Sequence, residues 1–387
     1  MSAAHTILIP EGTAEIISTG ELRNCEAWLS AFRDKVKDRR YYEIVEETVA
    51  GDFEHYYLLL KNGSARARGI QPLFFVRQNL VEGVPGKVST MVDLIRKIFP
   101  RFLTMRVLMV GCAAGTGELG VFDPADSIWL ANALHRSLLP LARRHKASLI
   151  VLKDFPASYR TTLASFPENG YARVPSMPMT RLALNYATFD EYLGSIGYMT
   201  RKGLRRKFRK AERAAKIEME VVNNISPHVD EIYPLYLEVH QRSPFKFETL
   251  TKDYFRRIGE RMSERARFFI WRQDRKIIAF ALCFVHGDTI HDECIGLDYS
   301  IALELHLYFY TLRDVISWAM ANGFRYYCSG PLNYDPKLHL GHELAPLDLY
   351  VMHTNALFNP IFRCIIKYVG PTRHDPVLRQ FSNAGDL

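Results

Sequence analysis

The stretch RARFFIWRQDRKIIAFALCFVHGDTIHDECIGL, residues 265–297, decides the fold of the second half of the chain. It holds three runs rich in aromatic and aliphatic residues, and the polar turns QDRK and HGD separate them. Such runs between turn residues are typical of an antiparallel sheet. The apolar run 301–323 follows and ends in Asn-Gly, which predicts a long helix, and FRYYCSG, residues 324–330, predicts the next strand.

The first half of the chain shows the same order of elements. We expect strands at residues 55–63, 69–78 and 102–111, a helix at 123–146, and strands at 148–155 and 177–184, the last of which closes the first half. A chain of 387 residues exceeds the usual size of a single core. We therefore predict a mixed α/β (α+β) fold with two similar domains, residues 1–185 and 186–387.

The segment YMTRKGLRRKFRKAERAAK, residues 198–216, carries nine basic residues and a single acid. On a helix, Leu204, Phe208, Ala211 and Ala215 form a narrow apolar stripe, and the cations cover the rest of the surface. One face is therefore expected to pack inward while the other faces meet anions. A solvated charged surface without a ligand is the alternative.

The composition limits the classes of partner. Apolar residues make up 48% of the chain and charged residues 24%, which is typical of packed globular proteins. The formal net charge of +8 indicates anionic partners. Nucleic acid is disfavoured because the ring of Phe208 would pack inward rather than stack on bases. The anionic partners that remain are acidic lipid headgroups, the phosphates of coenzyme A and the acidic surface of an acyl carrier protein.

The sequence also carries signals on location. Its six cysteines lie far apart, which is typical of free thiols in a reducing compartment. The first residues, MSAAHTILIPEGTAEI, show no secretory pattern, and uncharged stretches fall short of the ~18 apolar residues that span a bilayer. We therefore expect a cytoplasmic protein whose membrane contact is peripheral, on the inner face of the cell membrane.

A glycine-rich segment in the first half, residues 106–120, has the glycine spacing of a nucleotide-binding motif. Gly115, Gly117 and Gly120 have GxGxxG spacing directly after a predicted strand. In a nucleotide site the helix would open at once, whereas seven residues intervene here, and Met109 stands where methyl-donor enzymes usually have an acid. A glycine-rich turn of the sheet is the favoured interpretation.

These patterns resemble a known family. The run TRKGLRRKFRKAERA (200–214), the strand meander, the long helix and NGFRYYCSGPLNYDPKLHLG (322–341) are similar to the C-terminal domain of the FemAB-like and BioF2-like branch of the GNAT acyltransferase superfamily. Members of that branch carry two GNAT-type domains in tandem. The resemblance implies an acyltransferase whose working site lies in the second half. The usual GNAT glycine motif for phosphate is absent here, as it is in Fem-like members.

The resemblance also implies how a donor binds. The donor would be acyl-CoA or an acyl carrier protein thioester, with no metal, and its pantetheine would lie between strands 289–297 and 324–330. Backbone amides would hold the thioester oxygen, and helix-start amides with basic side chains would meet the phosphates. The expected donor contacts are Ile295, Gly296, Leu297, Tyr299, Ser300, Arg205 and Arg206.

Proton transfer requires a base for the attacking amine and an acid for the departing thiolate. His291 and Glu293 fall on one face of the predicted strand by two-residue alternation, and either could be the base or hydrogen-bonded scaffolding. Two further candidates lie in the first turns of the apolar helix: His306 for catalysis and Glu304 for substrate binding.

Two residues beyond the last strand complete the candidate site. Tyr334 could protonate the sulfur, or it could be a capped aromatic in a turn. Lys337 occupies the place of a lysine often seen in the family, and we assign it to substrate binding. Cys328 is interpreted as a packing residue, since GNAT-type transfer is direct.

The apolar helix, the aromatic strands and the basic face favour transfer of a long acyl chain to a lipid amine. Within its branch the chain is similar to bacterial ceramide synthases, which acylate a sphingoid base, although no residue distinguishes that amine from another long-chain amine. An aminoacyl-tRNA-dependent Fem-like peptidoglycan transferase shares the fold and remains an alternative. A non-catalytic membrane- or polyanion-binding protein is the other.

Overall fold

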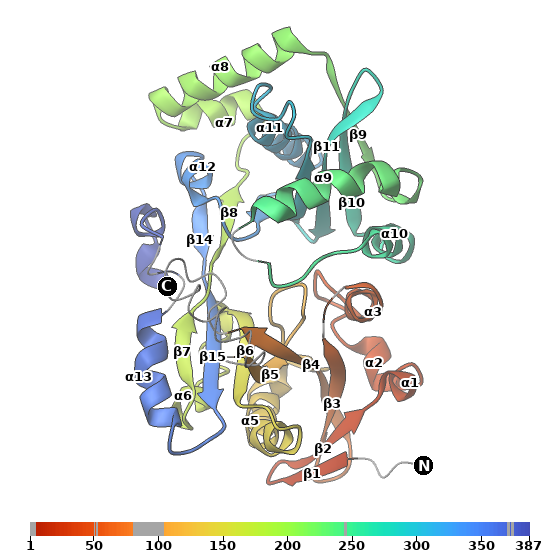
Figure 1. The fold of residues 1–387 in the computed structure, drawn as a ribbon, viewed down its shortest axis with the longest axis vertical. Helices are drawn as coiled ribbons and strands as arrows, with labels where there is room; N and C mark the ends of the chain where they lie inside the picture. Colours follow the sequence, from red (N-terminus) through yellow and green to blue (C-terminus); the bar gives the residue numbers. More distant parts are fainter. Residues whose placement is uncertain are drawn as a thin grey trace, which may run out of the picture. The chain divides into compact units, whose positions relative to one another are not determined.

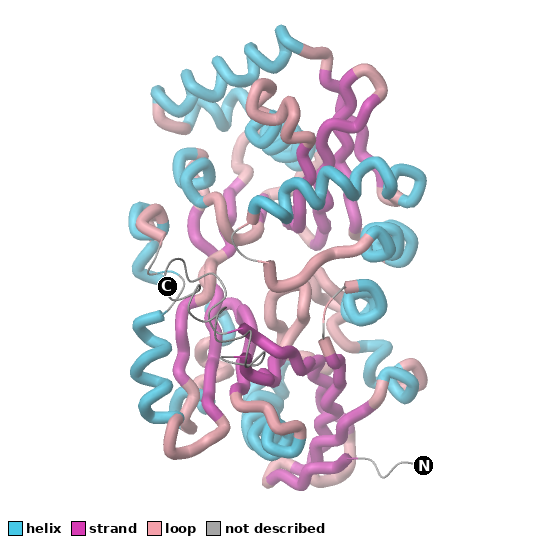
Figure 2. Tube along the Cα trace, in the orientation of Figure 1, coloured by secondary structure: helices cyan, strands magenta, loops and turns pink. Residues whose placement is uncertain are grey.

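A computed structural model describes residues 5–49, 51, 53–79, 104–243, 246–369, 372 and 375–387. These residues form two compact units, each with its own sheet (Figures 1 and 2). Unit 1 takes residues 1–46, 51–176 and 346–374, and unit 2 takes 47–50, 177–345 and 375–387. The predicted division at residue 185 is linear, whereas the two units interleave along the chain. No helix of the described segments is long and apolar enough to cross a bilayer.

Unit 1 is built on a mixed sheet. Its described strands, in spatial order, are β1 (His5–Ile9), β2 (Gly12–Ile17), β3 (Glu54–Asn62), β4 (Ala67–Asn79), β5 (Thr104–Val110), β6 (Leu149–Pro156), β15 (Leu347–His353) and β7 (Ala172–Pro175). Among these described strands, only β5 and β6 pair in parallel, and helix α5 (Ser127–Arg144) connects them. Its residues Leu130, Leu134 and Leu138 are fully buried in the core. The predicted strands up to residue 155 and the predicted helix are confirmed.

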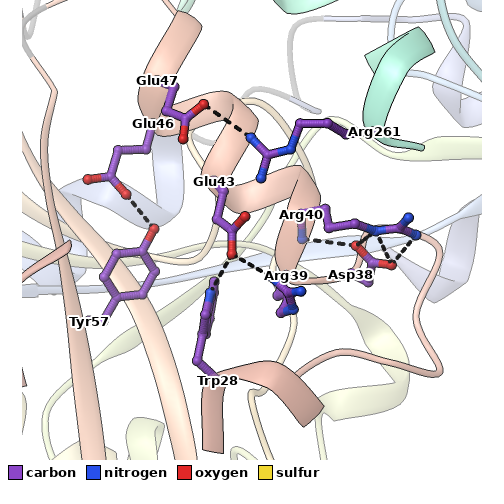
Figure 3. A network of polar contacts seen from close by, with 9 residues as sticks. All are labelled: Trp28, Asp38, Arg39, Arg40, Glu43, Glu46, Glu47, Tyr57 and Arg261. Atoms are coloured by element: carbon purple, nitrogen blue, oxygen red, sulfur yellow. Dashed lines mark hydrogen bonds and ion pairs between the residues drawn. The ribbon is translucent and has the colours of Figure 1, made fainter. Parts of the chain in front are cut away.

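Short helices complete unit 1: α1 (Thr19–Leu22), α2 (Glu26–Ser30), α3 (Arg39–Thr48), α6 (Ser165–Glu168) and α13 (Asn359–Val369). Polar contacts hold α3 in place (Figure 3). Glu43 accepts hydrogen bonds from Trp28 Nε1 (2.9 Å) and Arg39 (2.7 Å), and Tyr57 donates to Glu46 (2.6 Å). Glu47, on the last turn of α3, is grouped with unit 2.

Unit 2 contains the predicted three-strand meander. Its described strands, in spatial order, are β14 (Glu343–Ala345), β8 (Met179–Ala183), β13 (Tyr326–Ser329), β12 (Thr289–Leu297), β11 (Lys276–His286), β10 (Ala266–Gln273) and β9 (Ile217–Val222). As in unit 1, one pair of the described strands is parallel: β12 pairs with β13, and helix α11 (Leu307–Ala321) connects these two strands. The helix begins six residues later than 301, because His306 has a left-handed backbone conformation (φ 49°) that a helix cannot continue through.

The remaining helices of unit 2 cover both faces of this sheet. They are α7 (Phe189–Ser195), α8 (Tyr198–Ala214), α9 (Val229–Arg242), α10 (Lys252–Arg261) and α12 (Tyr334–His339). The basic segment is the predicted helix α8, and its stripe residues Leu204, Phe208 and Ala211 are buried in the core with α11. Helix α9 crosses the opposite face, over β11 and β12 (Figure 1).

The pairing of one strand corrects the sequence analysis. The predicted strand 177–184 exists as β8, but it pairs with β13 and β14 in unit 2 instead of closing the first half. In return, β15 from the end of the sequence lies between β6 and β7 of unit 1. Alternation of residues predicts that a strand forms, but it does not identify the strand's neighbours.

The glycine-rich segment of unit 1 lies where the pairing of β5 with β6 ends, at Val110 and Leu152. Gly117 donates its amide to the Asp154 carbonyl (2.9 Å), and the Gly120 carbonyl accepts from the amide of Ile70 (2.8 Å). A Cβ on Gly120 would lie 1.9 Å from the Ile70 carbonyl oxygen, so the residue must be glycine for the segment to pass this closely. The segment therefore fills the space between β4 and β6 beyond the end of β5.

The buried stripe of α8 generates a stability prediction. Phe208 is 7% exposed and packs in the core of unit 2, so Phe208→Ala should lower the free energy of unfolding by about 3 kcal/mol or more. Urea unfolding followed by circular dichroism measures this change. Lys210→Ala, on the exposed side of the same helix, is the control and should stay within about 0.5 kcal/mol of the wild type. Equal effects of the two changes would contradict the assigned packing.

Candidate active site

The strands β12 and β13 part within the sheet of unit 2. They pair in parallel only from Thr289 with Tyr326 to Asp292 with Ser329, and β12 then continues alone on this side to Leu297. The pairing of β12 with β11 shows a bulge at the same place. Bulges bend a strand and are frequent beside active sites. The bend and the end of pairing together open the sheet at this point.

The bulge changes which residues share a face. Cys294 pairs with Leu282 and Asp292 with Cys283, so Glu293 is the extra residue. The two-residue alternation that predicts a common face for His291 and Glu293 is thus interrupted between them. Asp292 lies opposite Cys283 on the face that α11 covers.

His291 lies on the other face of β12. It pairs with Phe284, on the side of β11 that packs toward α9 and α10. Gly296 is also on that side, where a Cβ would lie 2.8 Å from the backbone of Leu235 in α9. Glycine at this position is therefore explained by helix packing. Ile295 pairs with Ala281 on the α11 face.

Asp292 belongs to a buried polar cluster that the sequence analysis does not include. Tyr327, 1% exposed, donates its hydroxyl to Asp292 Oδ2 (2.7 Å). The other oxygen, Oδ1, is buried and makes no hydrogen bond among the described residues. Burial raises the pKa of Asp292; Tyr327 and Lys337 oppose the rise, and the charge of Glu293 adds to it. Its signal in the sequence is an acid two residues after Ile290, which strand alternation places on the same face as that apolar residue.

Lys337 ties α12 to the loop after β13. Its Nζ donates to the carbonyls of Gly330 (2.5 Å) and Leu332 (2.9 Å), and the residue is 4% exposed. Burial lowers the pKa of Lys337 to about 8, against the attraction of Asp292. The structure thus brings this predicted residue together with Asp292 at the point where the strands part.

His342 is a further member of the cluster that the sequence analysis does not identify. Its Nδ1 lies 3.1 Å from Thr180 Oγ1, and its Nε2 is buried without a hydrogen-bond partner in the described part of the chain. Burial, with the charge of Lys337, lowers the pKa of His342 to about 3. The imidazole is therefore neutral in the folded protein at neutral pH.

Tyr334 and Cys328 have structural surroundings. The Tyr334 hydroxyl donates to the Pro178 carbonyl (2.8 Å), and its ring packs on Phe381. This geometry is that of a capped aromatic, which is the second of the two interpretations of Tyr334. Burial raises the pKa of the Cys328 thiol to about 11, as suits a packing residue.

The amides expected to meet donor phosphates have partners within the protein. The amide of Tyr299 donates to Glu238 Oε2 (3.0 Å), and that of Ser300 donates to Asp298 Oδ1 (3.0 Å). Asp298 also pairs with Lys276 (2.6 Å). Two carboxylates thus occupy the positions predicted for phosphate. Leu297 is buried just before this turn.

Cations gather instead where α8 passes the start of α11. Burial lowers the pKa of His306, and the charges of Lys207, Lys210 and Arg206 lower it further. The Lys207 ammonium lies 3.4 Å above the ring of Phe309. An open hollow of about 580 Å³ follows the helix and is lined by Arg206, Arg209, Lys210, Arg213 and Ala214.

The other two predicted residues of this region lie differently. Arg205 is turned toward Asp190 of α7, with 3.9 Å between the charged atoms. Glu304 is exposed in the turn before α11. The structure therefore brings Arg206, and not Arg205, together with His306.

His342 generates a prediction of pH dependence. Its folded pKa, about 3, lies below the ordinary value of 6.5, so the folded state binds the proton less tightly than the unfolded chain. The stabilising difference is present above pH 6.5 and is lost as the pH falls toward 3. Between pH 7 and pH 4 the free energy of unfolding should fall by about 3 kcal/mol more for the wild type than for His342→Gln. Urea unfolding across this range tests it, and parallel curves for the two proteins would contradict it.

Comparison with known proteins places this site in a recognised domain. Residues 199–338 match the acetyltransferase (GNAT) domain family. This range contains α8, the bulged strand β12, α11, β13 and Lys337.

Solved structures with the same fold span both units. FemX is 13% identical, and the match covers 91% of this chain and 100% of FemX with a TM-score of 0.52. The C-terminal domain of a provisionally named lysylphosphatidylglycerol synthetase from Agrobacterium fabrum is 12% identical, with 85% of this chain and 94% of that domain covered and a TM-score of 0.50. With the two mixed sheets, these likenesses confirm the predicted mixed α/β fold of two domains, and the family match identifies a GNAT domain in the second half of the chain.

A curated relative comes from Mycobacterium tuberculosis (strain CDC 1551 / Oshkosh) and carries the provisional name 8-amino-7-oxononanoate synthase 2. It is 21% identical over 317 residues, which are 80% of this chain and 41% of the relative. The chain thus spans less than half the length of that protein. Residues 199–338 therefore form a GNAT domain, and the described chain has a fold similar to that of FemX.

Proposed function

We propose that the protein is an N-acyltransferase that moves a long acyl chain from acyl-CoA or an acyl carrier protein thioester to the amine of a lipid precursor. A sphingoid base is the acceptor to test first. The observation that carries the proposal is the parting of β12 and β13 beside the buried Asp292–Tyr327 pair. A pantetheine chain is extended and carries amide groups, so it suits the opening between two parting strands.

The donor would lie along β12 beyond the bulge. Backbone amides in the segment Ile295–Leu297, which includes Gly296, would hold the thioester oxygen as negative charge develops on it. The phosphates would meet Arg206, Lys207 and Lys210 beside His306, instead of the Tyr299 and Ser300 amides, which already bind carboxylates.

Asp292 is the proposed base. Its raised pKa suits a carboxylate that must accept a proton from an amine, and its Oδ1 is open to a further hydrogen bond. The neutral nitrogen attacks the thioester carbon while its proton passes to Asp292, and the C–S bond then breaks. Glu293, the next residue, would favour the protonated form of Asp292 through its charge.

Lys337 is proposed to protonate the departing thiolate. The pKa of its ammonium, about 8, allows it to give up a proton near neutral pH. We prefer it to Tyr334, which donates its single hydroxyl proton to the Pro178 carbonyl, because the Lys337 ammonium has a third N–H besides the two that it donates to Gly330 and Leu332. His291 would support the strand from the opposite face, and Glu304, exposed two residues before His306, would contact the amine substrate from outside.

The choice of a lipid acceptor has separate support. The name of the Agrobacterium protein, lysylphosphatidylglycerol synthetase, is that of an enzyme with a lipid product. An amine on a long chain would be met at a membrane surface, which suits a peripheral protein on the cytoplasmic side. The Fem-like alternative, transfer from aminoacyl-tRNA, is favoured by the exposed cations of α8 alone.

The first test is mass spectrometry of the products formed from long-chain acyl-CoA and a panel of amines: sphinganine, 3-ketosphinganine, lyso-lipids, amino acids and polyamines. We expect an N-acylated long-chain base. Asp292→Asn should lower kcat about 100-fold or more, because the amide cannot accept the proton. The matched control is Asp288→Asn, an exposed acid in the turn before β12, which should retain full activity.

Three outcomes would argue against this assignment. Full activity of Asp292→Asn would remove the proposed base, and Glu293→Gln and His291→Gln would then identify the residue in its place. No product with any amine would remove acyl-CoA as donor. Charged tRNA would replace it if it were bound with a steep salt dependence.

The cations beside His306 generate a prediction on the donor. Replacing both Arg206 and Lys210 with Gln should raise KM for acyl-CoA about tenfold, since two charged contacts to phosphate are lost. Arg205→Gln is the control, because Arg205 faces Asp190. With an acyl-pantetheine donor, which lacks phosphate, all variants should match the wild type. A KM for acyl-CoA that is unchanged in the double variant would place the phosphates elsewhere.

A further inference from the structure

Unit 1 carries an exposed apolar face on α13 and the turn before it. Leu357 is 83% exposed, Phe358 59%, Ile361 60% and Ile365 56%. Ile361 and Ile365 are four residues apart and lie on one side of α13, and Leu357 and Phe358, in the turn before the helix, precede Ile361 by four and three residues. We call these four side chains the α13 face. Large aliphatic and aromatic side chains in such a group mark a contact surface, whereas single exposed ones need no explanation.

The α13 face is held outward by contacts on the inner side of the helix. Asn359 donates its amide to the Gly170 carbonyl (2.9 Å) and accepts from the amide of His353 (3.0 Å). The ring of His353 lies 6.0 Å from that of Phe362. In the preceding turn, Asn355 Oδ1 accepts from the Leu357 amide (2.9 Å). The helix is therefore docked on unit 1, and its apolar residues are exposed in this docked position.

The charge of the segment indicates what covers the face. From Thr354 to His374 the sequence contains no Asp or Glu, whereas it contains Arg363, Lys367 and Arg373. An apolar face with cations and no anions is typical of helices that lie in the interface of an anionic bilayer. A second copy of the chain is a poor occupant, because packing this segment on itself would bring cations together without a compensating acid.

We propose that the α13 face inserts into the headgroup region of an anionic phospholipid bilayer. The apolar side chains would enter the boundary with the acyl chains, and the positive charge of the segment 354–374 would favour anionic headgroups. This contact is distinct from the active site in unit 2. It does not depend on which amine the enzyme acylates.

Flotation with lipid vesicles tests the proposal on the full chain. The wild type should float with vesicles of equal parts phosphatidylglycerol and phosphatidylcholine, and less with phosphatidylcholine alone. The double variant Ile361→Glu with Ile365→Glu should partition at least tenfold more weakly, because two apolar residues are lost and two anions are introduced. The control is Ile128→Glu, on α5, whose side chain is also 60% exposed, and it should float as the wild type does.

A local measurement separates α13 from the basic helix α8, which could also attract anionic lipid. The chain has four native tryptophans, so the wild-type fluorescence spectrum is subtracted from that of Ile361→Trp. The remaining emission, which comes from the introduced tryptophan, should shift to the blue when vesicles are added. Ile128→Trp should show no shift. Circular dichroism should show that every variant is folded, since these side chains are exposed.

Specific results would overturn the proposal. They are undiminished flotation of the double glutamate variant, an equal loss for Ile128→Glu, or an unshifted Ile361→Trp spectrum. Sedimentation would reveal the other occupant: a dimer that the double variant dissociates would assign the α13 face to a second copy and not to lipid.

Discussion

The short parallel pairing of β12 with β13 is the constraint on which the active site depends. Only four residues of each strand pair, from Thr289 to Asp292 on β12. The bulge at Glu293 then bends β12, while Lys337 binds the carbonyls of the loop that follows β13. The strands cannot pair further, because one is bent and the other is held. The Tyr327–Asp292 hydrogen bond links both strands at this point, so the opening and a carboxyl of raised pKa come from one arrangement.

The two units treat the equivalent position differently. In unit 1 the parallel strands β5 and β6 also stop pairing after four residues, but the glycine-rich segment follows and binds to β6 at Asp154. Gly117 and Gly120 permit this approach, since a Cβ at either position would collide with neighbouring atoms. The backbone of the chain thus satisfies the edge of β6 that would otherwise face a donor. The glycines that resemble a nucleotide motif in the sequence serve this closure, which agrees with a site in the second unit.

Local periodicity could be predicted from the sequence, whereas contacts between distant residues could not. The buried stripe of α8, with Leu204 and Phe208, follows from helical spacing alone. The faces of β12 do not, because the bulge depends on its register with β11, and so Asp292 was not among the predicted site residues although its neighbours were. Lys337 was predicted through a resemblance, but its carbonyl partners depend on two left-handed residues, Leu332 and Asn333, that no motif signals.

The exchange of strands between the units has a consequence for how the chain is made. The sheet of unit 1 needs β15, residues 347–353, between β6 and β7, although β7 ends at Pro175. During synthesis, β6 and β7 must therefore wait for more than 170 further residues before the strand between them emerges from the ribosome. Contacts that are so distant in sequence are slow to form, and the exposed edges of β6 and β7 are open to wrong pairing in the meantime. The sheet of unit 1 is thus completed late in synthesis, when β15 inserts between β6 and β7.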